Sequence, residues 1–166
     1  WMVGGWVNIT ANVAEYPTLM HKGYGTGTGT DREYIIYIDG GTAKVRFDIR
    51  NASNDTSYSL ASDDFGGIST GNWYHFVVGV DPGGDKMIVS VNGVRTEAAF
   101  TDAQQSGTSP VQFGHTNDGG KLNGALDDFF YLKGYILSDA ECEAIYAGGT
   151  GLAVAAWAPA AFVARD

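Results

Sequence analysis

Hydrophobic and polar residues alternate most regularly along residues 44–50. Val45, Phe47 and Ile49 are apolar, and the residues that flank them are charged. Successive side chains of a strand point to opposite faces, so this period of two predicts a strand with one buried and one solvated face. A sheet with one solvated face is typical of antiparallel pairing.

Further short runs of strand-forming residues follow one another along the chain, separated by Gly, Asn and Asp. They predict strands over residues 3–9, 18–21, 34–39, 57–61, 73–80, 87–91, from 94 onward, and over 111–114 and 125–133. The Asp-Gly-Gly turn after residue 38 and the pair Asn92-Gly93 indicate hairpins. Asn-Gly supplies the two positive φ angles that a type I′ turn needs.

One segment, residues 138–147, predicts a helix. Ser138 is a natural N-cap, and Glu141 three residues later completes a capping box. The two glycines that follow the segment end the helix. Cys142 and Ile145 lie three residues apart, hence on one face, so we expect Cys142 to be a buried hydrophobic residue rather than a nucleophile.

Regularly spaced short strands and one late helix predict the fold class. We expect an all-β, two-sheet antiparallel sandwich with one short C-terminal helix. The length of 166 residues suits one domain, which we place over residues 1–150. Residues 151–166 form an apolar, Ala-rich tail, interpreted as a last strand or a docking segment. We expect this tail to be buried on the sandwich or against a partner chain, because its apolar residues would otherwise form an exposed patch.

Charge and composition exclude several kinds of partner. The chain has 10 Lys and Arg against 19 Asp and Glu, a net charge of −9. Nucleic acids and anionic membrane surfaces attract basic proteins, so we expect neither as a partner. No apolar run reaches the roughly 20 residues needed to span a bilayer. The single cysteine, Cys142, excludes an internal disulfide. The chain starts at Trp1 without a secretory signal, so we expect a processed chain or a piece of a larger polypeptide.

Two stretches resemble one known family. Residues 71–94, GNWYHFVVGVDPGGDKMIVSVNGV, are similar to the Trp-x-His strand, turn and hairpin of laminin-G-like domains. Residues 113–149 are similar to the closing segment of these domains, in which Gly-x-Ile-Asp-Glu precedes a strand, Leu-Ser and a short helix. The chain thus resembles the LamG-like jelly rolls of the concanavalin A-like lectin/glucanase superfamily.

The resemblance implies that the sandwich is a jelly roll of two curved sheets, with about six or seven strands in each. It also implies binding or adhesion far more often than catalysis. Members of this family normally have one or two strands before the Trp-Val strand, whereas here Trp6-Val7 lies almost at the start of the chain. We therefore expect those strands to be missing or to be supplied by the C-terminal tail or by another chain.

The carboxylates that catalysis would need are not in the expected pattern. Glucanases of this fold carry paired carboxylates spaced Glu-x-Asp-x-x-Glu, and retention needs them about 5–5.5 Å apart. Glu141 and Glu143 belong to the predicted helix, and the neighbours Asp127 and Asp128 are expected to point to opposite faces. We therefore expect no enzyme activity. His75, at a core position of the family, is interpreted as a structural histidine.

The resemblance also implies a metal site. Asp127 in the stretch GALDD matches a family position that often ligates one structural Ca²⁺. Calcium takes roughly six to eight oxygen ligands, for which Asn117, Asp118 or the N-terminal segment are candidates. The alternative is that Asp127 caps a turn or pairs with a backbone N–H. In either case we expect Asp127, rather than Asp128, to turn inward.

Sugar binding needs an exposed aromatic ring together with planar polar side chains that pair with hydroxyl groups. Candidates are Tyr37, Arg46, Asp48 and Arg50 on the solvated face of two strands, and His115, Asn117 and Asp118 in a loop. The alternative is a solvated polar face that carries only cross-strand ion pairs.

These observations favour a non-catalytic carbohydrate-binding or adhesion module of a larger extracellular or surface protein. Its partner would be a glycan or a surface protein. The alternative is a structural or decoration domain of a viral or extracellular assembly, docked through the edge at Trp1–Met2 and the apolar tail. Both interpretations place the chain outside the cell, at the cell surface or at the virion surface. Fold alone does not decide between them.

Overall fold

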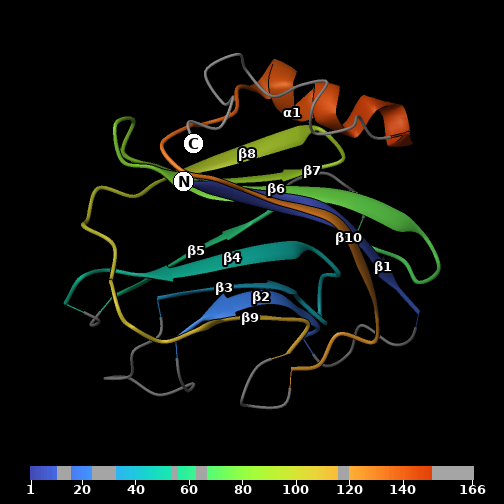
Figure 1. The fold of residues 1–166 in the computed structure, drawn as a ribbon, viewed down its shortest axis with the longest axis horizontal. Helices are drawn as coiled ribbons and strands as arrows, with labels where there is room; N and C mark the ends of the chain where they lie inside the picture. Colours follow the sequence, from blue (N-terminus) through green and yellow to red (C-terminus); the bar gives the residue numbers. More distant parts are fainter. Residues whose placement is uncertain (11–15, 24–32, 54–55, 63–66, 116–119, 151–166) are drawn as a thin grey trace, which may run out of the picture.

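The computed structural model describes residues 1–10, 16–23, 33–53, 56–62, 67–115 and 120–150. These residues form two antiparallel five-stranded sheets, stacked face to face, with one helix on the outer side of the first sheet (Figure 1). The predicted fold class, a two-sheet antiparallel sandwich with one short C-terminal helix, is confirmed. Each sheet has five strands in the described part of the chain, fewer than the six or seven that the resemblance implies.

Each sheet joins strands that are far apart in the sequence. Sheet A has the order β10 (Gly124–Leu132), β1 (Met2–Ile9), β6 (Trp73–Asp81), β7 (Lys86–Val91) and β8 (Val94–Ala99). Sheet B has the order β5 (Ser57–Ala61), β4 (Val45–Arg50), β3 (Tyr34–Ile38), β2 (Thr18–Lys22) and β9 (Val111–Phe113). All ten predicted strands are present, with bounds close to those expected from the sequence. The turn between β7 and β8 has positive φ at Asn92 (49°) and Gly93 (83°), as the Asn-Gly prediction requires.

The main core lies between the two sheets and follows the alternation of the strands. Val45, Phe47 and Ile49 of β4 are fully buried. They pack in one cluster with residues of sheet A that include Val7 and Phe76. Because one face of β4 is used in this way, the other face is the outer face of sheet B.

The helix α1 (Asp139–Tyr146) covers the outer face of sheet A (Figure 1). The predicted capping box is confirmed: Ser138 accepts from the Glu141 N–H, and the Glu141 carboxylate accepts from the Ser138 N–H. Cys142 and Ile145 are buried in a second apolar cluster that includes Met2 of β1. Burial raises the pKa of the Cys142 thiol to about 11, so Cys142 is a buried hydrophobic residue as expected. A 3₁₀ turn, η2 (Ala147–Gly149), follows the helix.

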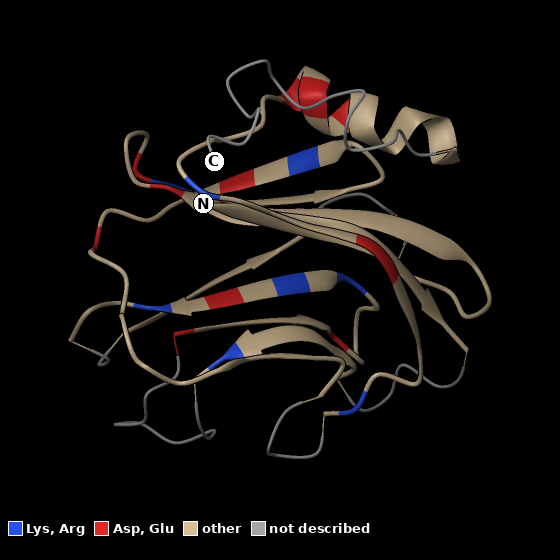
Figure 2. Cartoon of the chain, viewed as in Figure 1, with Lys and Arg blue, Asp and Glu red and all other residues tan. Residues whose placement is uncertain are grey.

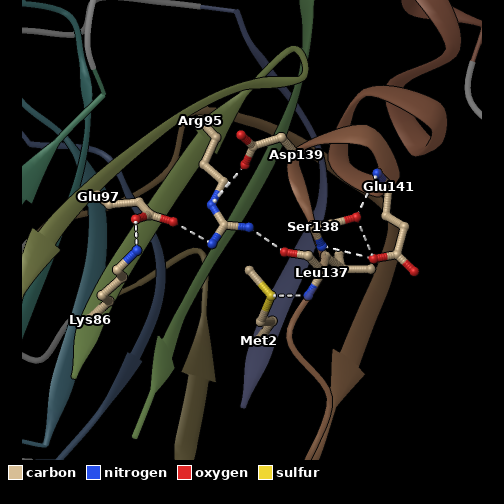
Figure 3. Close-up of polar contacts among 8 residues, drawn as sticks. All are labelled: Met2, Lys86, Arg95, Glu97, Leu137, Ser138, Asp139 and Glu141. Atoms are coloured by element: carbon tan, nitrogen blue, oxygen red, sulfur yellow. Dashed lines mark hydrogen bonds and ion pairs between the residues drawn. The ribbon is translucent and has the colours of Figure 1, made fainter. Parts of the chain in front are cut away.

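Arg95 of β8 ties the start of the helix to sheet A (Figure 3). Its guanidinium donates to the Leu137 carbonyl oxygen and forms ion pairs with Asp139 (3.2 Å) and Glu97 (2.5 Å). The Leu137 N–H in turn donates to the Met2 sulfur at 3.0 Å. The Arg95 side chain is only 11% exposed, so these partners compensate a charge that is largely removed from water.

Two expectations concern the C-terminal end of the chain. The apolar tail over residues 151–166 lies outside the described residues. The boundary of the domain near residue 150 therefore stays a prediction. Within the described residues, no helix has both the length and the apolar character needed to cross a membrane.

Candidate functional site

Three of the predicted sugar-binding residues meet on the outer face of sheet B. The register of β3 and β4 places Tyr37 directly opposite Arg46, and Asp48 two pairs further along, on the same face, opposite Ile35. Basic and acidic residues are interleaved along β4 in Figure 2. The strand therefore presents both charges on one surface, as its alternating sequence predicts.

Hydrogen bonds hold these polar groups in fixed positions. The Tyr37 hydroxyl donates to Asp48 Oδ2 at 3.2 Å. Arg46 donates from Nη1 to Asp39 Oδ2 at 3.0 Å and from Nη2 to Ser59 Oγ at 2.6 Å. We call these five residues the polar cluster. Because each planar group is anchored by a neighbour, the cluster is preorganised, which lowers the entropy cost of binding a ligand.

The turn after β3 positions the Asp39 carboxylate. Asp39 Oδ1 accepts hydrogen bonds from the backbone N–H groups of Gly41, at 2.8 Å, and Thr42, at 3.3 Å. This leaves Oδ2 for the hydrogen bond from Arg46. The Arg46 hydrogen bond, followed by the backbone donors, lowers the pKa of the Asp39 carboxyl below its ordinary value. The same pairing raises the pKa of Arg46. Both groups are thus charged at neutral pH.

Two tyrosines supply aromatic surface beside the cluster. Burial, followed by the negative charge of Asp48, raises the pKa of Tyr37 to about 12, so the phenol stays protonated and donates. The Tyr16 ring meets the Tyr37 ring edge-on, with centroids 5.9 Å apart, and is 57% exposed. Tyr16 was not among the sequence candidates, since nothing in its local pattern places it next to β3.

A row of residues directly opposite one another crosses all five strands of this face. The row consists of Gln112, His21, Ile35, Asp48 and Ser59, on β9, β2, β3, β4 and β5. Asp48 Oδ1 and Gln112 Oε1 are buried without a hydrogen-bond partner, as is Arg46 Nε beside them. Buried polar atoms normally have hydrogen-bond partners, so these three atoms are exceptions among the described residues. Gln112 and Ser59 were missed because only the register of the sheet brings them into the row.

The other sugar-binding candidates are more scattered. Arg50 faces outward opposite Ser57, at the end of β4 away from Tyr37. His115 is exposed, and the bond from the Gly114 N–H to the Leu19 carbonyl places it near the Tyr37 end of the sheet. The predicted candidates Asn117 and Asp118 lie outside the described residues.

The expectation that Asp127 turns inward is wrong. Both Asp127 and Asp128 are exposed. A β-bulge between β1 and β10 interrupts the alternation, with Asp128 at φ 46° and its N–H donating to Asp127 Oδ1 at 2.8 Å. Asp127 thus bonds a backbone N–H, which was the alternative to metal binding.

In the described part of the chain, no cluster of acidic side chains marks a calcium site. No group of three or more His, Cys, Asp or Glu residues there could hold a metal ion. One Ca²⁺ at Asp127 therefore stays a prediction. Melting curves test it: a higher Tm with calcium that is lost in Asp127→Asn would support the site, and identical curves with calcium and with a chelator would contradict it.

Comparison with known proteins gives one family match. The family model Laminin_G_3, described as the concanavalin A-like lectin/glucanases superfamily, matches residues 3–141. The comparison with curated proteins found no match.

Several solved structures share the fold at low sequence identity. The CBM40 module of the Ruminococcus gnavus IT-sialidase, bound to α2,3-sialyllactose, has a TM-score of 0.69 and 18% identity over 87% of this chain and 81% of its own. The heptameric SAP-like pentraxin from Limulus polyphemus has a TM-score of 0.60 and 14% identity over 87% and 68%. Domain 4 of the extracellular arabinanase AbnA from Geobacillus stearothermophilus, in complex with arabinotriose, has a TM-score of 0.55 and 17% identity over 77% and 57%.

Proposed function

The chain belongs to the concanavalin A-like lectin/glucanase superfamily, and from that premise we propose that it is a non-catalytic carbohydrate-binding module. We place the ligand on the outer face of sheet B. The observation that carries this proposal is the polar cluster around Tyr37, Arg46 and Asp48. Family membership alone would leave the function open, because one fold supports many functions.

The chemistry of the cluster suits sugar hydroxyl groups. A hydroxyl both donates and accepts, and here an arginine supplies donors while carboxylates supply acceptors on the same surface. Tyr16 and Tyr37 add ring surface against which the apolar face of a sugar can pack. Orientation by a few fixed polar groups beside aromatic surface is the usual composition of a small-molecule site.

The ionisation of Asp39 makes this residue unsuited to the acid role that a glycosidase needs. A glycosidase needs one carboxylic acid that is protonated at the working pH, so that it can donate to the leaving group. In this cluster the hydrogen bond from Arg46 lowers the pKa of Asp39, which favours the carboxylate. Asp39 is therefore suited to accept hydrogen bonds and unsuited to be a general acid.

The comparisons support the same proposal at the level of the fold. The sialidase module and the arabinanase domain are both structures with a bound saccharide. The arabinanase is also described as extracellular, which supports placing this chain in a larger extracellular or surface protein. Adhesion to a glycosylated surface would follow from the same binding.

A glycan array with the purified protein tests the proposal. We expect saturable binding to at least one glycan class, and loss of that binding in Asp48→Asn, which removes a charge without changing the side-chain shape. Asp128→Asn is the matched control, because Asp128 is an exposed aspartate of sheet A, away from the cluster. Equal binding by the three proteins, or no binding at all, would contradict the proposal.

A further inference from the structure

A groove of about 670 Å³ opens along one side of the sandwich, between the edge strands β9 and β10. Its apolar walls are formed by Trp1, Val111, Phe113, Phe129 and Tyr131. We call it the edge groove. None of the polar cluster residues lines it, so it is separate from the face on which the proposed function rests.

The walls of the edge groove expose large side chains that proteins usually bury. Tyr131 is 53% exposed, Phe113 52% and Val111 39%. The Trp1 and Tyr131 rings are stacked, with centroids 6.2 Å apart and planes at 21°. Phe113 and Phe129 pack edge-on at 4.6 Å. The rings thus support one another in fixed positions and present aromatic surface to the solvent.

Planar polar groups lie along the rim of the edge groove. The Trp1 indole Nε1 donates to Gln104 Oε1 at 2.7 Å, which orients the Gln104 carboxamide and leaves its NH₂ end outside that bond. Gln105 and Ser106 follow in the same rim. Amide and hydroxyl groups of this kind both donate and accept, as sugar hydroxyls do.

The charge of the edge groove is balanced. Lys22 and Glu33 are the residues of its lining with charged side chains, and they pair with each other at 2.5 Å. The Gly107 N–H also donates to Glu33 Oε1 at 2.8 Å. Neither charge is left over for a ligand, and the net charge of −9 on the chain repels anions. Charge complementarity therefore favours an uncharged ligand.

We propose that the edge groove is a second binding site, for a short uncharged oligosaccharide. The apolar face of a sugar ring packs on Tyr131 and Phe113, and its hydroxyls pair with the carboxamides of Gln104 and Gln105. The volume lies within the roughly 300–1,000 Å³ of small-molecule sites, which are likewise mostly apolar with a few polar groups.

The edge strands themselves argue against an added β-strand as the occupant. β9 has three residues, which is too short for a stable ladder. β10 carries the bulge and the exposed carboxylates of Asp127 and Asp128. Short edge strands, bulges and edge charges are the features by which proteins prevent strand addition.

An NMR titration of the isotope-labelled protein tests the second site. The ligands are maltotriose, cellotriose, xylotriose and, as a charged probe, 3′-sialyllactose. We expect at least one neutral trisaccharide to shift the Trp1 indole N–H signal. We expect Tyr131→Ala and Phe113→Ala to weaken that binding roughly tenfold or more, the usual size of a lost aromatic anchor. Trp73→Ala is the matched control, since Trp73 is 45% exposed and does not line the edge groove.

Three outcomes would overturn the second site. The first is that no neutral trisaccharide shifts the Trp1 signal at millimolar concentration. The second is that the Tyr131 and Phe113 variants bind as the wild type does. The third is self-association in sedimentation experiments, or binding of a peptide, that the same variants abolish, because this would assign the edge groove to a second copy or to a peptide.

The Asp48→Asn variant separates this site from the proposed function. Loss of glycan binding in Asp48→Asn, with the Trp1 shift retained, supports both sites. Loss of the Trp1 shift in Tyr131→Ala, without any effect of Asp48→Asn on glycan binding, supports the edge groove and contradicts the proposed site on sheet B.

Discussion

The Tyr37 hydroxyl donates to Asp48 Oδ2 over 3.2 Å and joins neighbouring strands on the outer face of sheet B. The bond occupies one carboxylate oxygen, while Asp48 Oδ1 is buried without a partner. Because the pKa of Tyr37 is raised to about 12, the donor keeps its proton across the physiological range. This pair connects the stability of sheet B with the binding that we propose for it.

Tyr37→Phe is expected to lower both stability and glycan affinity. The free energy of unfolding should fall by about 1–3 kcal/mol, because a hydrogen bond to a carboxylate is lost. The affinity for the best ligand of the glycan array should fall roughly tenfold. Denaturant unfolding and calorimetric titration measure the two effects.

The matched control for this prediction is Tyr58→Phe. Tyr58 donates a comparable hydrogen bond to Asp102 at 2.8 Å, and it lies on the face of β5 opposite to the cluster residue Ser59. This variant should lose stability and keep its affinity. A similar loss of affinity in both variants would show that the effect of Tyr37 is not local.

His75 is expected to make stability depend on pH. It is 2% exposed, and burial lowers its pKa from 6.5 to about 4. The folded state therefore holds neutral His75 where the unfolded state is already protonated. Above pH 6.5 His75 is neutral in both states and does not lower the free energy of unfolding. As the pH drops from 6.5 towards 4, the free energy of unfolding should fall by about 1.4 kcal/mol per pH unit.

Denaturant unfolding at a series of pH values, with His75→Gln for comparison, measures this dependence. The variant should lack the slope between pH 6.5 and 4 that His75 contributes. The carboxyls whose pKa is lowered, Asp39, Glu97 and Glu141, are common to both proteins and cancel in the comparison. Parallel curves for the two proteins would contradict the role of His75.

Arg95→Met is expected to loosen the helix. The substitution keeps most of the side-chain volume but leaves the Leu137 carbonyl and Asp139 without their donor. Charge-assisted hydrogen bonds from a largely buried side chain predict a loss of about 2–3 kcal/mol in the free energy of unfolding. Lys86→Met is the control, with an expected loss of about 0–1 kcal/mol, because the Lys86 side chain is 46% exposed. Equal losses would assign Arg95 no special role.

Asp128→Val is expected to destabilise the bulge of β10. At φ 46° a β-branched residue is strained, which predicts a loss of about 1–2 kcal/mol in the free energy of unfolding. Asp128→Asn should be nearly neutral, since Asn tolerates this conformation. Thermal melts of the two variants test the assignment, and equal Tm values would show that the bulge does not constrain residue 128.

Short-range patterns in the sequence were sufficient for the secondary structure. The period of two along β4 identified its buried residues, because each side chain of a strand points away from the next. The Ser138 and Glu141 spacing identified the helix start, because the capping box is closed within one turn. Asn92-Gly93 identified a hairpin for the same reason, since the turn conformation is a property of two residues.

The tertiary structure decided what these elements bring together. Asp48 was a candidate from its exposure, but its bond to Tyr37 and its row with Gln112 and Ser59 depend on strand register. The edge groove joins Trp1 with Gln104, 103 residues apart, and no local pattern predicts that contact. The bulge at Asp128 overturned an alternation that the sequence alone predicts, because a bulge depends on how two distant strands pair. Alternation determines the face of the sheet to which a side chain points, whereas the pairing of distant strands determines which residues lie beside it. Both candidate sites of this protein consist of residues that only this long-range pairing brings together.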